Sequence, residues 1–123
     1  MTSGLANASD LLVTVDESDQ RMLVRLRGRL SIYSSPALRD QLLAVVRRAS
    51  TKEVVVDLTE VSYIDASGIA TLVEALKIAR NRRNNLCLKG LQGRVLHLFE
   101  VTGLLDLFTT NGCRSASTLS KVP

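Results

Sequence analysis

The run Asp65-Ala66-Ser67-Gly68 brings a carboxylate, a hydroxyl and a glycine together within four positions. Aspartate is a preferred N-terminal cap of helices, because its side-chain oxygens accept hydrogen bonds from the unpaired N–H groups of the first turn. Its negative charge also interacts favourably with the positive end of the helix dipole. We therefore expect Asp65 to begin a helix and to accept from the N–H of Ser67 or Gly68.

The same run offers a hydroxyl and a glycine whose roles the residue types leave open. Ser67 is either an ordinary first-turn serine or a regulated hydroxyl. A phosphate on it would be favoured by the helix N-terminus and repelled by Asp65. Gly68 either lets a partner backbone approach or accommodates a tight helix entry. Apolar neighbours that could form the centre of a docking interface are Ile64, Ile69 and Ala70.

Residue types for catalysis or for metal and nucleotide binding are sparse. The single histidine, His97, is expected on the surface of a different helix, and the sequence has no Gly-x-Ser-x-Gly elbow. One histidine and two distant cysteines, Cys87 and Cys113, cannot complete a tetrahedral zinc site. The two cysteines also give no disulfide framework and no Cys-x-x-Cys spacing, so both are expected as free thiols. No phosphate-binding loop with a Gly-Lys-Ser/Thr ending is present. We therefore expect no enzyme, no metal and no cofactor.

The charge of the chain permits but does not define an anionic partner. The formal net charge is +4, and there are only two Tyr, two Phe and no Trp to stack on bases. Nucleic-acid binding is therefore less favoured than protein docking, because solvated helix ends explain the basic residues at least as well. The arginines concerned are Arg47, Arg48, Arg80, Arg82, Arg83 and Arg94.

Hydrophobic periodicity predicts an α/β domain with a mixed, mostly parallel sheet of four to five strands and helices packed against it. Alternating segments predict a hairpin whose turn lies at Asp16–Gln20 and whose second strand ends at Gly28. The nearly continuous apolar run Val54–Leu58 predicts a central strand covered on both faces. The expected strands are 11–15, 22–27, 54–58, 86–88 and, less strongly patterned, 105–108. The expected helices follow Ser34-Ser35-Pro36, start at Asp65–Gly68, and run through Val95–Thr102 to Gly103.

At 123 residues the chain is expected to form one domain. We predict a flexible N-terminal segment 1–10, a folded domain 11–108, and a weakly structured tail 109–123 with at most one short helix. No segment approaches the roughly 18 apolar residues of a membrane span, and the N-terminus lacks a signal-like pattern. A cytoplasmic location without membrane insertion is therefore expected.

Several segments in the right order resemble the STAS domain family, whose best-known members are bacterial anti-sigma-factor antagonists. The resemblance extends from about Leu11 to Phe108. The segments that carry it are Leu26–Leu30, Pro36–Leu38, Val54–Leu58, Ser62–Ile69 and Val95–Leu104.

The resemblance implies transcription regulation by partner switching. The domain would bind a kinase-like anti-sigma factor, free the sigma factor, and be inactivated when a serine at the start of the second helix is phosphorylated. In the antagonists that serine directly follows the Asp of the loop, whereas here the position is Ala66. Ser67, the next residue, is the candidate phosphorylation site. Ser31 stands where antagonists usually carry an Asp, and the weakly patterned C-terminal segment departs from the helix that commonly ends the family.

Another use of STAS domains remains as an alternative. They also serve as small cytoplasmic subunits of lipid-transporting ABC systems, where they dock on the ATPase subunit without phosphorylation. The alanine at position 66 fits that use equally well. In either case, the partner-binding face is predicted to comprise Ser31, Ser34, Ile64, Asp65, Ala66, Ser67, Gly68, Ile69 and Ala70.

Overall fold

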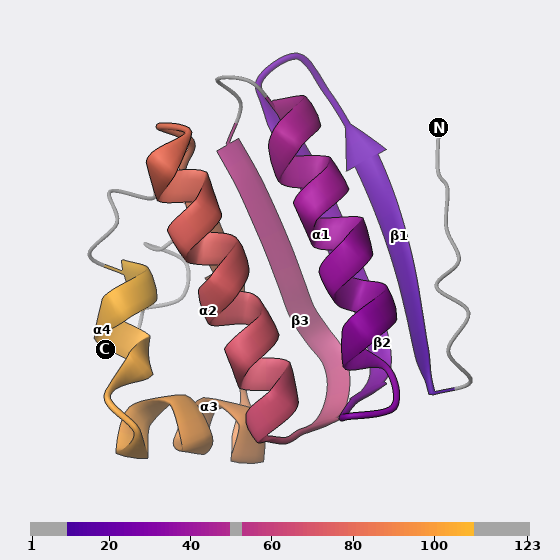
Figure 1. Ribbon diagram of the computed structural model, residues 1–123. Coiled ribbons are helices and arrows are strands. Elements are labelled where there is room, and N and C mark those ends of the chain that lie inside the picture. Colours follow the sequence, from indigo (N-terminus) through magenta and orange to yellow (C-terminus); the bar gives the residue numbers. More distant parts are fainter. Residues whose placement is uncertain (1–9, 50–52, 110–123) are drawn as a thin grey trace.

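The computed structural model describes residues 10–49 and 53–109 as an α/β domain with one four-stranded sheet (Figure 1). The strands lie in the order β1-β2-β3-β4. β1 and β2 form an antiparallel hairpin, and β3 and β4 add in parallel. The predicted fold class is therefore confirmed. The strands are β1 Leu11–Glu17, β2 Arg21–Leu30, β3 Glu53–Ile64 and β4 Leu86–Lys89.

Two long helices lie next to each other on one face of the sheet (Figure 1). They are α1, Ser35–Ala49, and α2, Ala66–Asn81. Each helix connects two neighbouring parallel strands, so both run opposite to the strands and parallel to each other. Their N-termini therefore meet at the end of the sheet where β2 and β3 finish.

The core between the helices and the sheet is aliphatic. Side chains from alternate positions of the strands, such as Val54, Val56 and Leu58, pack against the apolar stripes of α1 and α2. Leu38 and Leu42 of α1 and Leu72 and Leu76 of α2 are completely buried. This packing fixes the two helices on the sheet and so fixes their N-termini relative to each other.

Both inner strands are longer than the sequence indicated. β2 does not end at Gly28, because this glycine adopts φ +115° at a register shift and the strand continues to Leu30. A side chain at Gly28 would collide with the carbonyl oxygen of Asp10. β3 likewise continues to Ile64, paired with Leu30. The extra residues carry both strands to the start of α2.

The C-terminal part of the described chain is helical. α3 spans Gly93–Val101 and is followed by Gly103 at φ +77°, as predicted. The strand predicted over 105–108 is wrong, because these residues belong to α4, Leu104–Thr109. Phe108 is buried with its ring 5.9 Å from that of Phe99 in an edge-to-face contact. Packing of Phe108 against α3, rather than pairing with the sheet, therefore determines the helical conformation of residues 104–109. Residues 110–123 lie outside the described part of the chain.

His97 and Cys87 are residues whose environments the sequence predicts. His97 is exposed on α3, as predicted. Cys87 on β4 is disulfide-bonded, so the expectation of a free thiol is wrong for it, whereas Cys113 lies outside the described residues. Disulfide pairing depends on spatial approach, which spacing in the sequence does not reveal. Within residues 10–49 and 53–109, no helix has the length and apolar character needed to cross a membrane.

Candidate functional site

Asp65 is the N-cap of α2, as the sequence predicted. Its Oδ1 accepts hydrogen bonds from the N–H of Ser67 at 3.0 Å and of Gly68 at 3.1 Å. The hydroxyl of Ser67 donates to the same oxygen at 2.7 Å. One carboxylate oxygen therefore satisfies two unpaired backbone donors and fixes the Ser67 side chain against the first turn.

The second oxygen of Asp65 holds a different loop. Its Oδ2 accepts from the N–H of Ile32 at 3.2 Å, and the N–H of Asp65 donates to the carbonyl of Leu30 at 3.1 Å. The loop between β2 and α1 is thereby attached to the N-terminus of α2. This attachment brings residues 31–34 next to the Asp65 run, a proximity that the sequence indicates only through the family resemblance.

The loop serines are internal supports. Ser34 is fully buried, and its hydroxyl donates to the carbonyl of Arg29 at 2.8 Å and accepts from the N–H of Ser31 at 3.0 Å. Ser31 is 6% exposed, and its Oγ accepts from the N–H of Tyr33 at 3.2 Å. These bonds shape the turn. The side chains that the turn presents to solvent are instead Ile32, 57% exposed, and Tyr33, 79% exposed.

The predicted residues at the start of α2 divide between surface and core. Ala66 and Ala70 are exposed, and Ile69 is partly buried against the core. Ile64 and Gly68 are buried. A Cβ on Gly68 would lie 2.6 Å from Leu30 Cγ and 2.9 Å from Ile64 Cγ1. The glycine therefore allows α2 to pack closely on the ends of β2 and β3.

Ser35, which the sequence predicts only as part of a helix start, lies between the N-termini of α1 and α2. Its Oγ lies 3.2 Å from Ser67 Oγ and donates to the carbonyl of Ser31 at 2.7 Å. Ser67 gives its proton to the carboxylate of Asp65, and each hydroxyl has one proton. The contact between the two hydroxyls can therefore be a hydrogen bond only when one of these bonds is given up.

The electrostatics of the site favour an ionised Asp65. The pKa of its carboxyl is lowered, chiefly by the hydrogen bond from the Ser67 hydroxyl, while partial burial opposes the shift. The N–H groups of Gly68, Ile32 and Ser67 lower the pKa further. The site thus holds a fixed negative charge between two loops at neutral pH.

The sequence offered one signal for the exposed pair Ile32 and Tyr33. They stand between a predicted strand and a predicted helix, where apolar side chains contribute to neither periodic stripe. Apolar residues outside any core pattern are candidates for a contact surface. No comparable signal marked Ser35, whose role depends on the approach of α1 to α2.

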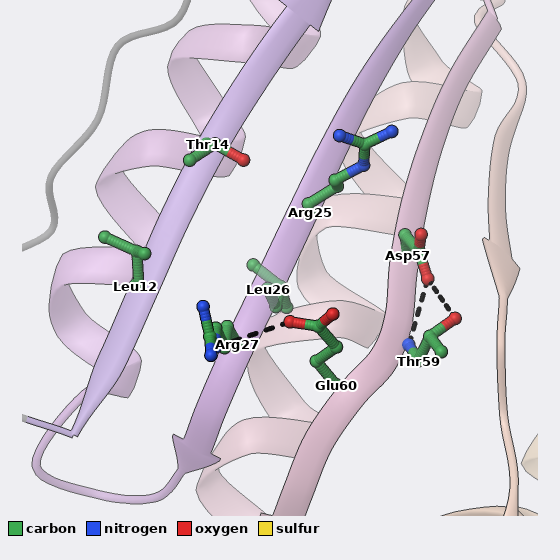
Figure 2. Close-up of a pocket in the computed structure, with 8 residues that line it drawn as sticks. All are labelled: Leu12, Thr14, Arg25, Leu26, Arg27, Asp57, Thr59 and Glu60. Atoms are coloured by element: carbon green, nitrogen blue, oxygen red, sulfur yellow. Dashed lines mark hydrogen bonds and ion pairs between the residues drawn. The ribbon is translucent and has the colours of Figure 1, made fainter.

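A groove lies on the face of the sheet that α1 and α2 do not cover. Figure 2 shows it across β1, β2 and β3, with the helices behind the strands, and its volume is about 350 Å³. Asp57 Oδ1 accepts from the N–H and the hydroxyl of Thr59, and Arg27 forms an ion pair with Glu60 at 3.4 Å (Figure 2). The prediction that β3 is covered on both faces is therefore wrong at Asp57, which is partly exposed here. None of the predicted site residues lines this groove.

Comparisons with known proteins agree in one family. A family model described as "Mlab, STAS domain" matches residues 13–109. An anti-sigma-B factor antagonist of Staphylococcus aureus (strain NCTC 8325 / PS 47) is 32% identical over 102 residues, which cover 83% of this chain and 94% of that protein. The protein of the same name from Staphylococcus epidermidis is 36% identical over 88 residues, 72% of this chain and 81% of the relative.

A solved structure shares the fold of this chain. The solved structure of an anti-sigma-factor antagonist (STAS) domain protein from Planctomyces limnophilus superposes with a TM-score of 0.71. It covers 78% of this chain and 86% of that chain at 19% identity. The family model spans most of the chain, and the Staphylococcus aureus relative is more than 30% identical over 83% of it, so the chain belongs to the STAS domain family.

Proposed function

We propose that this protein is a non-catalytic regulatory domain that acts as an anti-sigma-factor antagonist by docking on a kinase-like anti-sigma factor. The observation that carries the proposal is the tether between Asp65 and Ile32, which presents an exposed apolar pair beside the N-terminus of α2. The names of the Staphylococcus relatives support the antagonist role.

The proposed docking face, called face D, consists of the surface residues around that tether. Its centre is apolar, as the centre of a protein interface requires, and its scaffold is held by hydrogen bonds within the domain. Little reorganisation is then needed on binding, which favours affinity. The members of face D are Ile32, Tyr33, Ala66, Ser67, Ile69 and Ala70, supported from beneath by Ser31, Ser34, Ile64, Asp65 and Gly68.

Phosphorylation of Ser67 would weaken the binding of a partner to face D. The Ser67 hydroxyl donates to Asp65 at 2.7 Å, so a phosphate on Ser67 would remove that bond and place two negative groups together. The carboxylate would be pushed from its position between the loops, and Ile32 would lose its support. Incubation with the cognate kinase and ATP, followed by peptide mapping, tests this; a phosphate on Ser31 or Ser34 would contradict it.

A second candidate function rests on the alanine at position 66, which is exposed beside Asp65. In the resembling antagonists this is the phosphorylated position, so its replacement by alanine equally suits a STAS subunit that docks on an ABC ATPase without phosphorylation. The same face would be used, because its apolar centre does not depend on a phosphate.

The test compares capture of partners by three forms of the full chain. Tyr33→Asp places a charge on face D at a side chain that is 79% exposed, so the fold should be unaffected. Val101→Asp is the matched control, because Val101 is 64% exposed on α3, outside face D. Ile69 is less suitable because it packs against the core.

Captured proteins are identified by mass spectrometry. The proposal expects an anti-sigma factor of kinase-like fold bound by the wild type and the control but lost with Tyr33→Asp. An ABC ATPase with the same dependence on Tyr33 would support the alternative instead. Equal capture of either partner by all three forms would refute face D.

A further inference from the structure

The ends of α1 and α2 that are remote from face D lie at the end of the sheet where β3 starts (Figure 1). Nη2 of Arg82 donates to the carbonyl of Arg47 at 3.2 Å, and Nδ2 of Asn84 donates to the carbonyl of Val46 at 3.2 Å. The residues that follow α2 therefore contact the last turn of α1, which brings basic residues that are separated in the sequence close together.

This surface, called the arginine pole, carries an excess of positive charge. Arg48 is paired with Glu17 at 2.8 Å. Across the described part of the chain, no carboxylate forms an ion pair with Arg47, Arg82 or Arg83, all of which are exposed. The members of the arginine pole are Arg47, Arg48, Arg80, Arg82 and Arg83.

Basic residues at the C-terminal ends of α1 and α2 interact favourably with the helix dipoles, but this interaction does not explain why an arginine stands at position 83. Arg83 has φ +62° and ends α2 in a Schellman motif, in which the N–H of Asn84 donates to the carbonyl of Ala79 at 2.8 Å and that of Arg83 to Arg80 at 3.0 Å. This left-handed position favours glycine or asparagine. Arg83 occupies this position, whereas the asparagine that would suit it better is the next residue, Asn84. A left-handed backbone at a residue other than glycine is strained, and strained backbone positions are concentrated at functional sites.

We propose that the arginine pole binds an acidic polypeptide segment, a run of Asp and Glu residues on a partner protein. The planar guanidinium fork matches a carboxylate with two parallel hydrogen bonds, and the five members of the arginine pole, all within the described residues, carry this group. Among residues 10–49 and 53–108, the exposed large apolar side chains are Leu12, Ile32, Tyr33, Tyr63 and Val101, none of which lies on the last turns of α1 or α2. The described part of the arginine pole therefore has no apolar side chain to stack on bases or to insert into a bilayer.

The experiment measures binding of a fluorescein-labelled oligoglutamate peptide to the full chain by fluorescence anisotropy. Arg47→Gln and Arg83→Asn should each weaken binding by up to about fivefold, the upper range for one exposed ion pair. Added salt should weaken binding further. Arg94→Gln is the matched control, because Arg94 is exposed on α3 without an ion pair among the described residues and lies outside the pole.

Arg83→Asn also has a second readout. Asparagine relieves the left-handed backbone, so this variant should melt a few degrees above the wild type while it binds the peptide less well. Unchanged peptide binding by Arg83→Asn, an equal loss with Arg94→Gln, or no binding to the wild type at low salt would overturn the proposal. So would tighter binding to duplex DNA or to phosphatidylserine vesicles than to the peptide. These results are independent of face D.

Discussion

The carboxylate of Asp65 accepts a hydrogen bond from the N–H of Ile32, 33 residues earlier in the chain, at 3.2 Å. The same side chain caps α2 through its other oxygen. One residue therefore both begins a helix and fixes the neighbouring loop. This double role connects the stability of the site to the position of the exposed residues on face D.

Replacement of Asp65 should separate the two roles. Asp65→Ala removes cap and tether and should lower the free energy of unfolding by about 1 to 2 kcal/mol, the range for loss of a helix cap. Asp65→Ser keeps an oxygen for the first turn but is too short to reach Ile32, so it should lose less stability. Urea denaturation measures the free energy of unfolding of both variants. Equal losses in Asp65→Ala and Asp65→Ser would show that the hydrogen bond to Ile32, and not the helix cap, provides most of the stability.

The stability that Asp65 confers should depend on pH. Its pKa is lowered in the folded protein from the usual 3.8, so its contribution is complete above that value and is lost as the pH falls through the folded pKa. The melting temperatures of wild type and Asp65→Asn should differ by a constant amount down to about pH 5 and converge in stronger acid.

Glu74 has a pKa lowered by Arg39 and responds to acid in the same direction. It is present in both proteins, so its effect cancels in the difference. A gap between wild type and Asp65→Asn that widened in acid would contradict the assignment.

Gly68→Ala should destabilise the domain although alanine is the better helix former. The added methyl group would meet Leu30 Cγ at 2.6 Å and the Leu30 carbonyl oxygen at 3.0 Å, so α2 would have to move. Overpacking of this kind costs about 1 to 3 kcal/mol. Ala70→Ser, at an exposed position of the same helix, serves as the control and should be nearly neutral. Chemical denaturation measures the free energy of unfolding of each variant. A higher value for Gly68→Ala than for the wild type would refute the close packing of α2 on Leu30.

The hydroxyls of Ser35 and Ser67 should contribute almost independently. Ser67→Ala loses the bond to Asp65, and Ser35→Ala loses the bond to the Ser31 carbonyl, each worth about 1 kcal/mol. Because both protons are used elsewhere, a double-mutant cycle should give a coupling free energy below about 0.5 kcal/mol. A larger coupling would mean that the 3.2 Å contact between the hydroxyls is itself a persistent hydrogen bond.

The sequence by itself determined the features that depend on neighbouring residues. The cap at Asp65, the start of α1 after Ser34, and the end of α3 before Gly103 all follow from interactions within about one helical turn. Hairpin pairing and the parallel strands followed from the spacing of apolar residues. These local rules were enough for the fold class and for one helix N-terminus of the candidate site.

Only the tertiary structure decided which of the site residues reach solvent. The pairing of Leu30 with Ile64 brings the loop after β2 against α2, buries Ser34 and leaves Tyr33 exposed. It also creates the close contact that requires glycine at position 68. Such contacts join residues more than 30 positions apart, and their geometry depends on strand register and helix packing, which the local pattern of the sequence does not fix.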